Sequence, residues 1–306
     1  MNDRIALAAQ DPNVVVHAHG LLAEFNEAGV LAPVDVASAQ AVSRLLGETD
    51  EAVTLAAALA VRGTRFGHVC VRVSTLRESV VVDGREAELV EALPWPEPDE
   101  WLERLRSSSL VGDGSGEHPL VLSDDRLYLE RYWRYEQQVA GLIRDRLGRG
   151  EAPLAPATEE TLRRLLAEDG ETTQFRAARV ALASKLAVIA GGPGTGKTYA
   201  VGAMLVALAA AGAETFPLVG LCAPTGKAAA RLGQAITELA RDVGDPAISA
   251  ILEQVTPQTI HRLLGWAWGR SRFRHDGSNR LPHDIVIVDE MSMVSLPLAA
   301  RLLAAL

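Results

Sequence analysis

A glycine-rich segment in the second half of the chain constrains the fold more than any other feature. It consists of Gly191-Gly192-Pro193-Gly194-Thr195-Gly196-Lys197-Thr198, which satisfies the phosphate-binding P-loop pattern G-x-x-x-x-G-K-[ST] at every required position. The apolar run 186–190 before it predicts a buried parallel strand, and the Ala- and Leu-rich residues 199–211 after it predict a helix. Strand, loop and helix together indicate an α/β domain that binds a nucleoside triphosphate.

Each residue type in this loop has a physical reason. Glycines let the backbone wrap around a phosphate, and a helix start directs unpaired N–H groups at it. We expect Lys197 to meet the β- and γ-phosphates and the Thr198 hydroxyl to meet Mg²⁺. The alternative, an ordinary glycine-rich turn, would not require the flanking strand and helix that this sequence supplies.

Composition and charge narrow the class of protein. The 306 residues suffice for two domains, and a hydrophobic content of 48% lets each bury a core. The net charge of −9 disfavours a broadly basic nucleic-acid binder but is compatible with a narrow groove that follows one strand. Two scattered cysteines, Cys70 and Cys222, indicate a reducing compartment without a disulfide framework. With no secretory signal and no apolar run of ~18 residues, we expect a cytoplasmic protein with no membrane association.

Periodicity and breaker residues divide the chain into two expected domains. Residues 1–148 are mainly helical, with a strand at 68–73 and a hairpin at 120–129. Residues 149–157 are rich in Gly and Pro and predict a linker. From 158 to 306 helices and strands alternate, which predicts a parallel α/β sheet whose first helix starts at Thr158 as N-cap.

A second strand carries the acids that a P-loop enzyme needs. The apolar run 285–288 ends in Asp289 and Glu290, the expected form of a Walker B element. Asp289 would hold Mg²⁺, and Glu290 would orient or deprotonate the attacking water. The alternative is a surface acid pair after a core strand.

Three further segments carry candidate residues with open alternatives. The amide of Gln174 suits the N6/N7 edge of adenine, but a solvent-facing helical glutamine is the more common case. Thr225 and Lys227 open a helix where free N–H groups and a cation could hold a DNA phosphate, or they belong to an ordinary strand-to-helix turn. Thr259 and His261 follow a Pro-containing loop, and the histidine taken alone suits a packed or capping role.

Together these segments resemble superfamily-one DNA helicases, and more specifically the RecD family, the alpha subunits of RecBCD exodeoxyribonuclease V. Besides Gln174 and the P-loop, the resemblance rests on residues 223–229, 259–265 and 288–293. In the first domain, residues 67–71 and 119–133 look like the RecD N-terminal region, whereas longer stand-alone relatives carry helix-hairpin-helix modules there.

The resemblance implies a mainly helical N-terminal docking domain followed by a P-loop, RecA-like α/β motor domain. It implies ATP and Mg²⁺ as cofactors, with Thr198 and Asp289 as the metal ligands. It also assigns three groups of residues: adenine contact by Gln174, catalysis by Lys197, Asp289 and Glu290, and proximity to DNA for Thr225, Lys227, Thr259 and His261.

The family moves 5′ to 3′ on one strand of a broken duplex, so the resemblance implies single- and double-stranded DNA ends as substrates. It also implies RecB-like and RecC-like partners in a heterotrimer for DNA repair by recombination. Because the nuclease centre of that complex lies in the beta subunit, no nuclease site is expected here. The alternatives are a stand-alone RecD-like or conjugative relaxase-type helicase, or a non-catalytic docking fragment with a vestigial nucleotide site.

The sequence departs from the family at its end. It stops at Leu306, soon after the Asp289-Glu290 pair, whereas the family continues with a second RecA-like domain and an arginine that reaches the γ-phosphate. Such an arginine contributes about 10³–10⁵ in rate. We therefore expect an incomplete first motor lobe that binds ATP but unwinds no DNA by itself.

Overall fold

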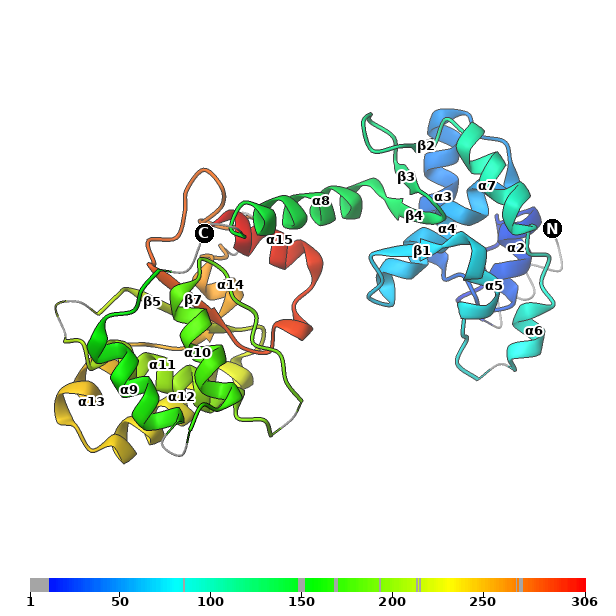
Figure 1. Cartoon of the computed structure of the whole chain (residues 1–306). Coiled ribbons are helices and arrows are strands. Elements are labelled where there is room, and N and C mark those ends of the chain that lie inside the picture. Colours follow the sequence, from blue (N-terminus) through cyan, green and yellow to red (C-terminus); the bar gives the residue numbers. More distant parts are fainter. Residues whose placement is uncertain are drawn as a thin grey trace. The chain divides into compact units, whose positions relative to one another are not determined.

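The computed structural model describes residues 11–84, 86–147, 152–167, 170–192, 194–212, 214, 216–267, 269 and 272–306. The chain forms two compact units, Met1–Gln137 and Gln138–Leu306 (Figure 1). Residue 148 of the expected first domain, residues 149–151 of the expected linker and Pro193 of the P-loop lie outside the described residues. The expected domain limits at 148 and 158 therefore stay a prediction.

Helices dominate the first unit, as the sequence predicts. Its elements in chain order are α2 (Gly20–Glu27), α3 (Pro33–Leu46), α4 (Glu51–Arg65), β1 (Cys70–Arg72), η1 (Val73–Thr75), α5 (Leu76–Ser79), α6 (Ala87–Glu91), α7 (Pro98–Ser107), β2 (Val111–Gly112), β3 (Leu120–Ser123) and β4 (Arg126–Leu129). Helix α8 (Glu130–Arg144) begins in this unit and ends in the second.

Local signals explain where the long helices begin. The carboxylate of Asp50 accepts a hydrogen bond from the backbone N–H of Ala52 at 2.8 Å and so caps α4. Asp35, in the first turn of α3, accepts from the backbone N–H of Ala32 at 2.8 Å. Each bond satisfies a backbone donor that a helix start would otherwise leave without a partner.

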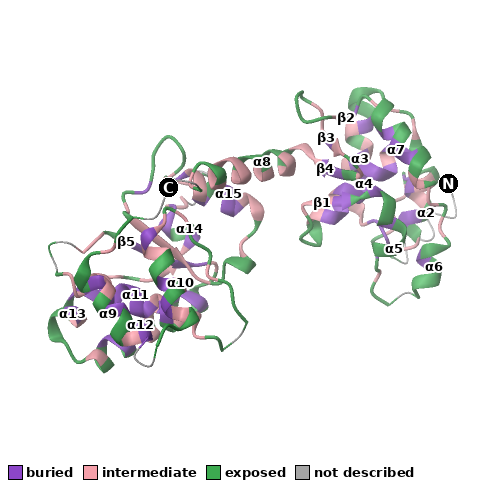
Figure 2. Cartoon of the chain, in the orientation of Figure 1, coloured by how far each residue is buried: buried purple, intermediate pink, exposed green. Residues whose placement is uncertain are grey.

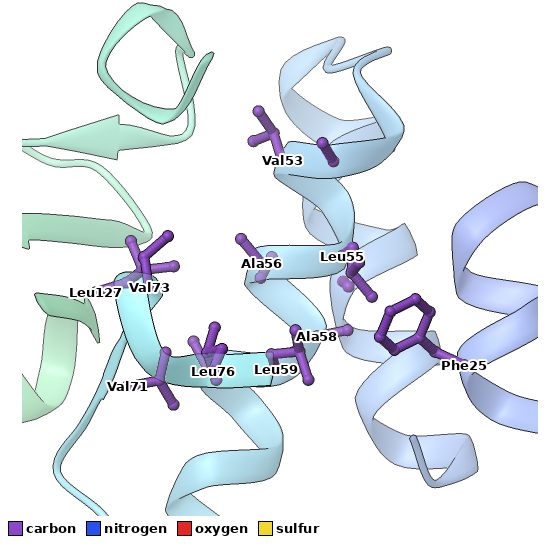
Figure 3. Close-up of a cluster of buried hydrophobic side chains, with 14 of the residues drawn as sticks. Phe25, Val53, Leu55, Ala56, Ala58, Leu59, Val71, Val73, Leu76 and Leu127 are labelled. Atoms are coloured by element: carbon purple, nitrogen blue, oxygen red, sulfur yellow. The ribbon is translucent and has the colours of Figure 1, made fainter. Parts of the chain in front are cut away.

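The core of the first unit surrounds α4, which packs against α2, α3, α7, β1 and β4. Figure 2 shows the buried positions along this helix, and Figure 3 shows Phe25, Leu55, Leu59 and Leu127 within one buried cluster. Burying a large apolar side chain contributes about 1.5–3 kcal/mol. The alanine-rich sequence of α4 lets its neighbours approach closely on several sides.

A small sheet completes the first unit, with strand order β1-β4-β3-β2. Strand β4 pairs antiparallel with β1 and with β3, and β2 pairs parallel with β3. The β3–β4 turn places Asp124 in the left-handed region with φ 57°, which aspartate tolerates better than most residues. The structure thus confirms the predicted hairpin at 120–129 and a strand within 68–73.

The second unit is a parallel α/β structure, as predicted. Its elements are α9 (Pro156–Leu166), α10 (Thr173–Ala183), α11 (Lys197–Ala209), β5 (Val219–Ala223), α12 (Gly226–Val243), α13 (Pro246–Leu252), β6 (Gln258–Thr259), α14 (Ile260–Leu263), β7 (Ile285–Val288), η3 (Met291–Met293) and α15 (Leu296–Ala304). The sheet has the order β6-β5-β7, with every strand pair parallel. No helix in the described part of the chain is long and apolar enough to cross a membrane.

Two local predictions for this unit are wrong. The apolar run 186–190 forms no strand, and the side chain of Val188 is 86% exposed. A strand needs a neighbouring ladder for its backbone groups as well as apolar side chains, and this run joins neither sheet. Helix α9 begins at Pro156 with Ala155 as N-cap, so Thr158 lies buried inside the helix. Proline favours the first helical position because its fixed φ suits a helix.

Candidate functional site

The described part of the glycine-rich loop leads directly into α11. The helix begins at Lys197, and its N-cap Gly196 has φ 78°, in the left-handed region. Gly194 has a similar φ of 74°. Because a side chain in this conformation costs about 1–2 kcal/mol, the loop needs glycine at both positions. Thr198 follows as the second residue of the helix, half-buried at its start.

The Lys197 side chain folds back over the loop that precedes it. Its ammonium Nζ donates to the carbonyl oxygens of Gly191 at 2.6 Å and Gly192 at 2.8 Å. The Thr195 hydroxyl also donates to the Gly192 carbonyl, at 2.9 Å. A phosphate is a charged and therefore stronger acceptor than a carbonyl, so Lys197 can exchange these bonds for contacts with a bound triphosphate.

Gln174 lies beside this loop. It belongs to the first turn of α10, and its Nε2 donates to the carbonyl oxygen of Thr195 at 3.0 Å. No local pattern in the sequence predicts this contact, because it joins residues 21 positions apart through the packing of two helices. The expected contact of Gln174 with adenine stays a prediction.

The three parallel strands end at one edge of the second sheet. Ala223 at the end of β5 pairs with Thr259 of β6, and Cys222 of β5 pairs with Val288 at the end of β7. The backbone N–H of Asp289 donates to the Cys222 carbonyl at 2.9 Å, which continues the ladder by one residue. In open α/β sheets, ligands bind at the carboxyl ends of the strands.

The two acids predicted to form the Walker B element, Asp289 and Glu290, lie at this carboxyl edge. The Asp289 side chain is half-buried, and its Oδ1 accepts from the backbone N–H of Glu290 at 2.9 Å. Glu290 is exposed and has φ 51°, in the left-handed region that costs a non-glycine residue free energy. Such strain tends to occur where function requires it, so this backbone supports a functional role for Glu290.

The candidate donors suit Mg²⁺ held together with phosphate. The described residues contain no group of three or more His, Cys, Asp or Glu side chains that could hold a metal ion. Mg²⁺ commonly keeps several waters and uses one or two protein oxygens plus substrate phosphates. One hydroxyl from Thr198 and one carboxylate from Asp289 match that requirement.

Two of the DNA-binding candidates are helix caps in this structure. The Thr225 hydroxyl accepts from the backbone N–H of Ala228 at 3.2 Å, at the start of α12. The Thr259 hydroxyl accepts from the backbone N–H of Arg262 at 3.2 Å, at the start of α14. Lys227 is exposed in the first turn of α12. Thr225 and Lys227 follow β5, and Thr259 is the last residue of β6, at the same sheet edge. The contact of these residues with DNA stays a prediction.

His261 belongs to a cluster of rings that sequence reasoning missed. Its ring centroid lies 5.7 Å from that of Phe273 and 6.4 Å from that of Trp266, and these two rings are 4.8 Å apart. The Arg301 guanidinium lies 5.3 Å from the Phe273 ring centroid. His261 nevertheless stays exposed, so its expected proximity to DNA and its packing role both stay predictions. The aromatic residues downstream of His261 were the available signal.

The surroundings of His283 predict that the stability of the second unit depends on pH. Its ring packs so closely on β5 that a Cβ on Gly220 would lie 3.0 Å from its Cδ2. Burial lowers the pKa of His283 below 6.5, repulsion from His275 lowers it further, and Asp284 opposes the shift. Since the native state prefers the neutral ring, its contribution to stability is complete above pH 6.5 and is lost as the pH falls through the native pKa.

We expect His283→Leu to reduce the loss of unfolding free energy between pH 8 and pH 5, measured by urea titration of the second unit. His19→Leu, at an exposed histidine of the first unit, is the control. Equal pH slopes in wild type and His283→Leu would contradict the role of His283.

Comparison with known proteins accounts for both units. A family model described as the N-terminal domain of RecBCD enzyme subunit RecD matches residues 27–128, and one described as an AAA domain matches residues 174–306. RecBCD enzyme subunit RecD of Mycobacterium tuberculosis is 46% identical over 299 residues, covering 95% of this chain and 48% of the relative. The chain belongs to the RecD family. The resemblance noted in the sequence is thereby confirmed.

Other relatives carry the RecD name as well. RecBCD enzyme subunit RecD of Mycolicibacterium smegmatis is 44% identical over 289 residues, 93% of this chain and 49% of the relative. The ATP-dependent RecD2 DNA helicase of Deinococcus radiodurans is 36% identical over 186 residues, 60% of this chain and 22% of the relative. The chain spans about half the length of the mycobacterial RecD proteins.

Proposed function

We propose that this chain is the ATP-binding part of a 5′–3′ DNA helicase subunit that processes double-strand ends within a RecBCD-type complex in recombinational repair. The observation that carries the proposal is the combination, in one RecD-family chain, of a P-loop leading into α11 and an acid pair at the carboxyl edge of the sheet. The proposal places the protein in the cytoplasm, where bacterial chromosomal DNA lies.

In this proposal the site binds ATP with Mg²⁺. Lys197 contacts the β- and γ-phosphates, while the Thr198 hydroxyl and Asp289 hold the metal. Glu290, an exposed carboxylate next to Asp289, orients or deprotonates the attacking water. Thr225, Lys227, Thr259 and His261 contribute to the path of a single DNA strand.

ATP hydrolysis by the chain tests the proposal, with and without single-stranded DNA, alone and mixed with RecB-like and RecC-like subunits. We expect ATP binding by the chain and DNA-stimulated hydrolysis when the partners are present. Failure to bind ATP under any of these conditions would overturn the proposal. Co-purification with both partners would distinguish the complex subunit from a stand-alone enzyme like the RecD2 helicase.

We further propose that the first unit docks onto a RecB- or RecC-like subunit through an apolar surface, here called the docking patch. The patch consists of the exposed side chains of Val34, Phe66 and Val81 around Arg62 and Arg65. Their exposed fractions are 52% for Val34, 57% for Phe66 and 72% for Val81. Aromatic and arginine side chains are enriched at protein interfaces.

Arginine contacts hold this surface together. Arg62 donates to the carbonyl oxygens of Val30 at 2.9 Å and Val81 at 2.7 Å, and its guanidinium lies 4.3 Å from the Phe66 ring centroid. Arg65 makes two hydrogen bonds to the buried carboxylate of Asp35, at 2.9 and 2.5 Å. Because these hydrogen bonds are buried or part-buried, the patch presents a preorganised surface.

Phe66→Ala is expected to weaken binding to the partner subunit by about 30-fold, since truncating a central interface aromatic costs roughly 2 kcal/mol. Leu45→Ala is the matched control. Leu45 is also exposed, at 82%, but lies at the opposite end of α3 from Val34. Titrating each variant against RecB- and RecC-like subunits separately measures the affinities. If Phe66→Ala and Leu45→Ala weakened partner binding equally, the docking interface would not be centred on Phe66.

A further inference from the structure

The first turn of α10 holds Gln174 in a fixed position. The Thr172 hydroxyl accepts from the backbone N–H of Phe175 at 3.0 Å and donates to the Leu166 carbonyl at 2.5 Å. The Phe175 ring is 1% exposed and lies in the core formed by α9, α10 and α11, with the Arg163 guanidinium 4.9 Å from its centroid. Gln174 is thus anchored by a helix cap on one side and a buried ring on the other.

From this position the Gln174 side chain reaches the last turn of the P-loop. Its Nε2 donates to the Thr195 carbonyl at 3.0 Å. A Cβ added to Gly196 would lie 2.5 Å from the same Nε2, so the amide fills the space next to the glycine. Glycine is therefore required at position 196 for two reasons: its φ is 78°, and the Gln174 amide occupies the space that a side chain would need.

This contact orients a backbone donor. The Thr195 carbonyl and the Gly196 N–H belong to one planar trans peptide group, in which the two bonds point in opposite directions. By holding the carbonyl towards α10, Gln174 makes the Gly196 N–H point away from α10. Backbone N–H groups of this loop are the donors that cradle phosphates in P-loop proteins.

We propose that Gln174 is a positioning residue for phosphate binding, because it fixes the Thr195–Gly196 peptide, and that it acts whatever base the nucleotide carries. The inference rests on the proposed nucleotide site and deepens it. The role of Gln174 in positioning the loop is separate from its expected contact with adenine. A residue that only recognises adenine would affect ATP but not a ligand that lacks a base.

Binding of three magnesium complexes by the intact chain tests the inference: ATP, GTP and inorganic tripolyphosphate. The variant Gln174→Met keeps the length of the side chain but removes the amide, and Gln174→Ala removes most of the side chain. Losing one hydrogen bond should weaken binding of each of the three ligands by about three- to tenfold. Titration calorimetry measures all three affinities in the same way.

The control is Gln40→Met in α3. The Gln40 amide also donates to a distant backbone carbonyl, that of His17 at 3.1 Å, but in the first unit. The Gln40→Met variant should bind all three ligands like wild type. Matching unfolding curves for Gln174→Met and Gln40→Met would show that both variants keep the fold. Weaker binding of ATP alone, or unchanged binding of every ligand, would overturn the positioning role. Failure of the wild type to bind ATP would instead remove the proposed function itself.

Discussion

Lys197→Ala is expected to abolish ATP-driven activity, with hydrolysis reduced by about 10²–10³ or more, as when one preorganised donor is removed from a charged transition state. In the structure the ammonium already lies over the loop, bonded to the Gly191 and Gly192 carbonyls. These bonds are exposed, so their loss changes the stability of the fold little. ATP affinity and hydrolysis, measured with single-stranded DNA and the partner subunits, check the result.

The same chain provides a matched control. It contains three lysines, and Lys185 is exposed twelve residues before Lys197 in the sequence, outside the P-loop. Lys185→Ala should leave hydrolysis unchanged. Docking of both variants onto the partner subunits should also stay intact, because the docking patch lies in the first unit. Loss of docking in Lys197→Ala would contradict the assignment of partner docking to the first unit and ATP binding to the second.

Several features of the site follow from local sequence. The P-loop predicts the start of α11 because only glycine tolerates the φ of 78° at Gly196 without strain, and Lys197 can then begin a helix. The Asp289-Glu290 pair directly follows the apolar run 285–288, which forms strand β7. Each of these conclusions needs only a few neighbouring residues, so the sequence alone supports them.

Other features depend on contacts between distant residues. The apolar run 186–190 has the composition of a strand, but it joins no ladder, and a strand exists only with a neighbour. The bond from Gln174 to Thr195 arises because α10 packs against α11, and no local pattern encodes it. The rings around His261 come from a segment that bends back on α14. All three features are determined by tertiary packing and not by local sequence.

Glu290→Gln is expected to keep ATP binding and to reduce hydrolysis by about 10²–10⁴, the usual contribution of a general base. Glutamine has the same shape as glutamate but cannot take a proton from water. The backbone should not change, because Asp289 still accepts the N–H of residue 290. Exposed Glu253 in the second unit gives the control Glu253→Gln, which should hydrolyse ATP like wild type. Binding and turnover are measured separately, with DNA and the partner subunits present.

Glu290→Gly separates the role of the side chain from that of its backbone. Relief of the left-handed φ gains about 1–2 kcal/mol, and the entropy of glycine costs about 0.5–1 kcal/mol, so the second unit should become slightly more stable while hydrolysis is lost. Asp124→Gly, at φ 57° in the first unit, removes a similar conformation and should keep full hydrolysis. Turnover that persists in both Glu290 variants would show that another group orients the water. A less stable Glu290→Gly protein would show that the backbone at residue 290 holds no strain.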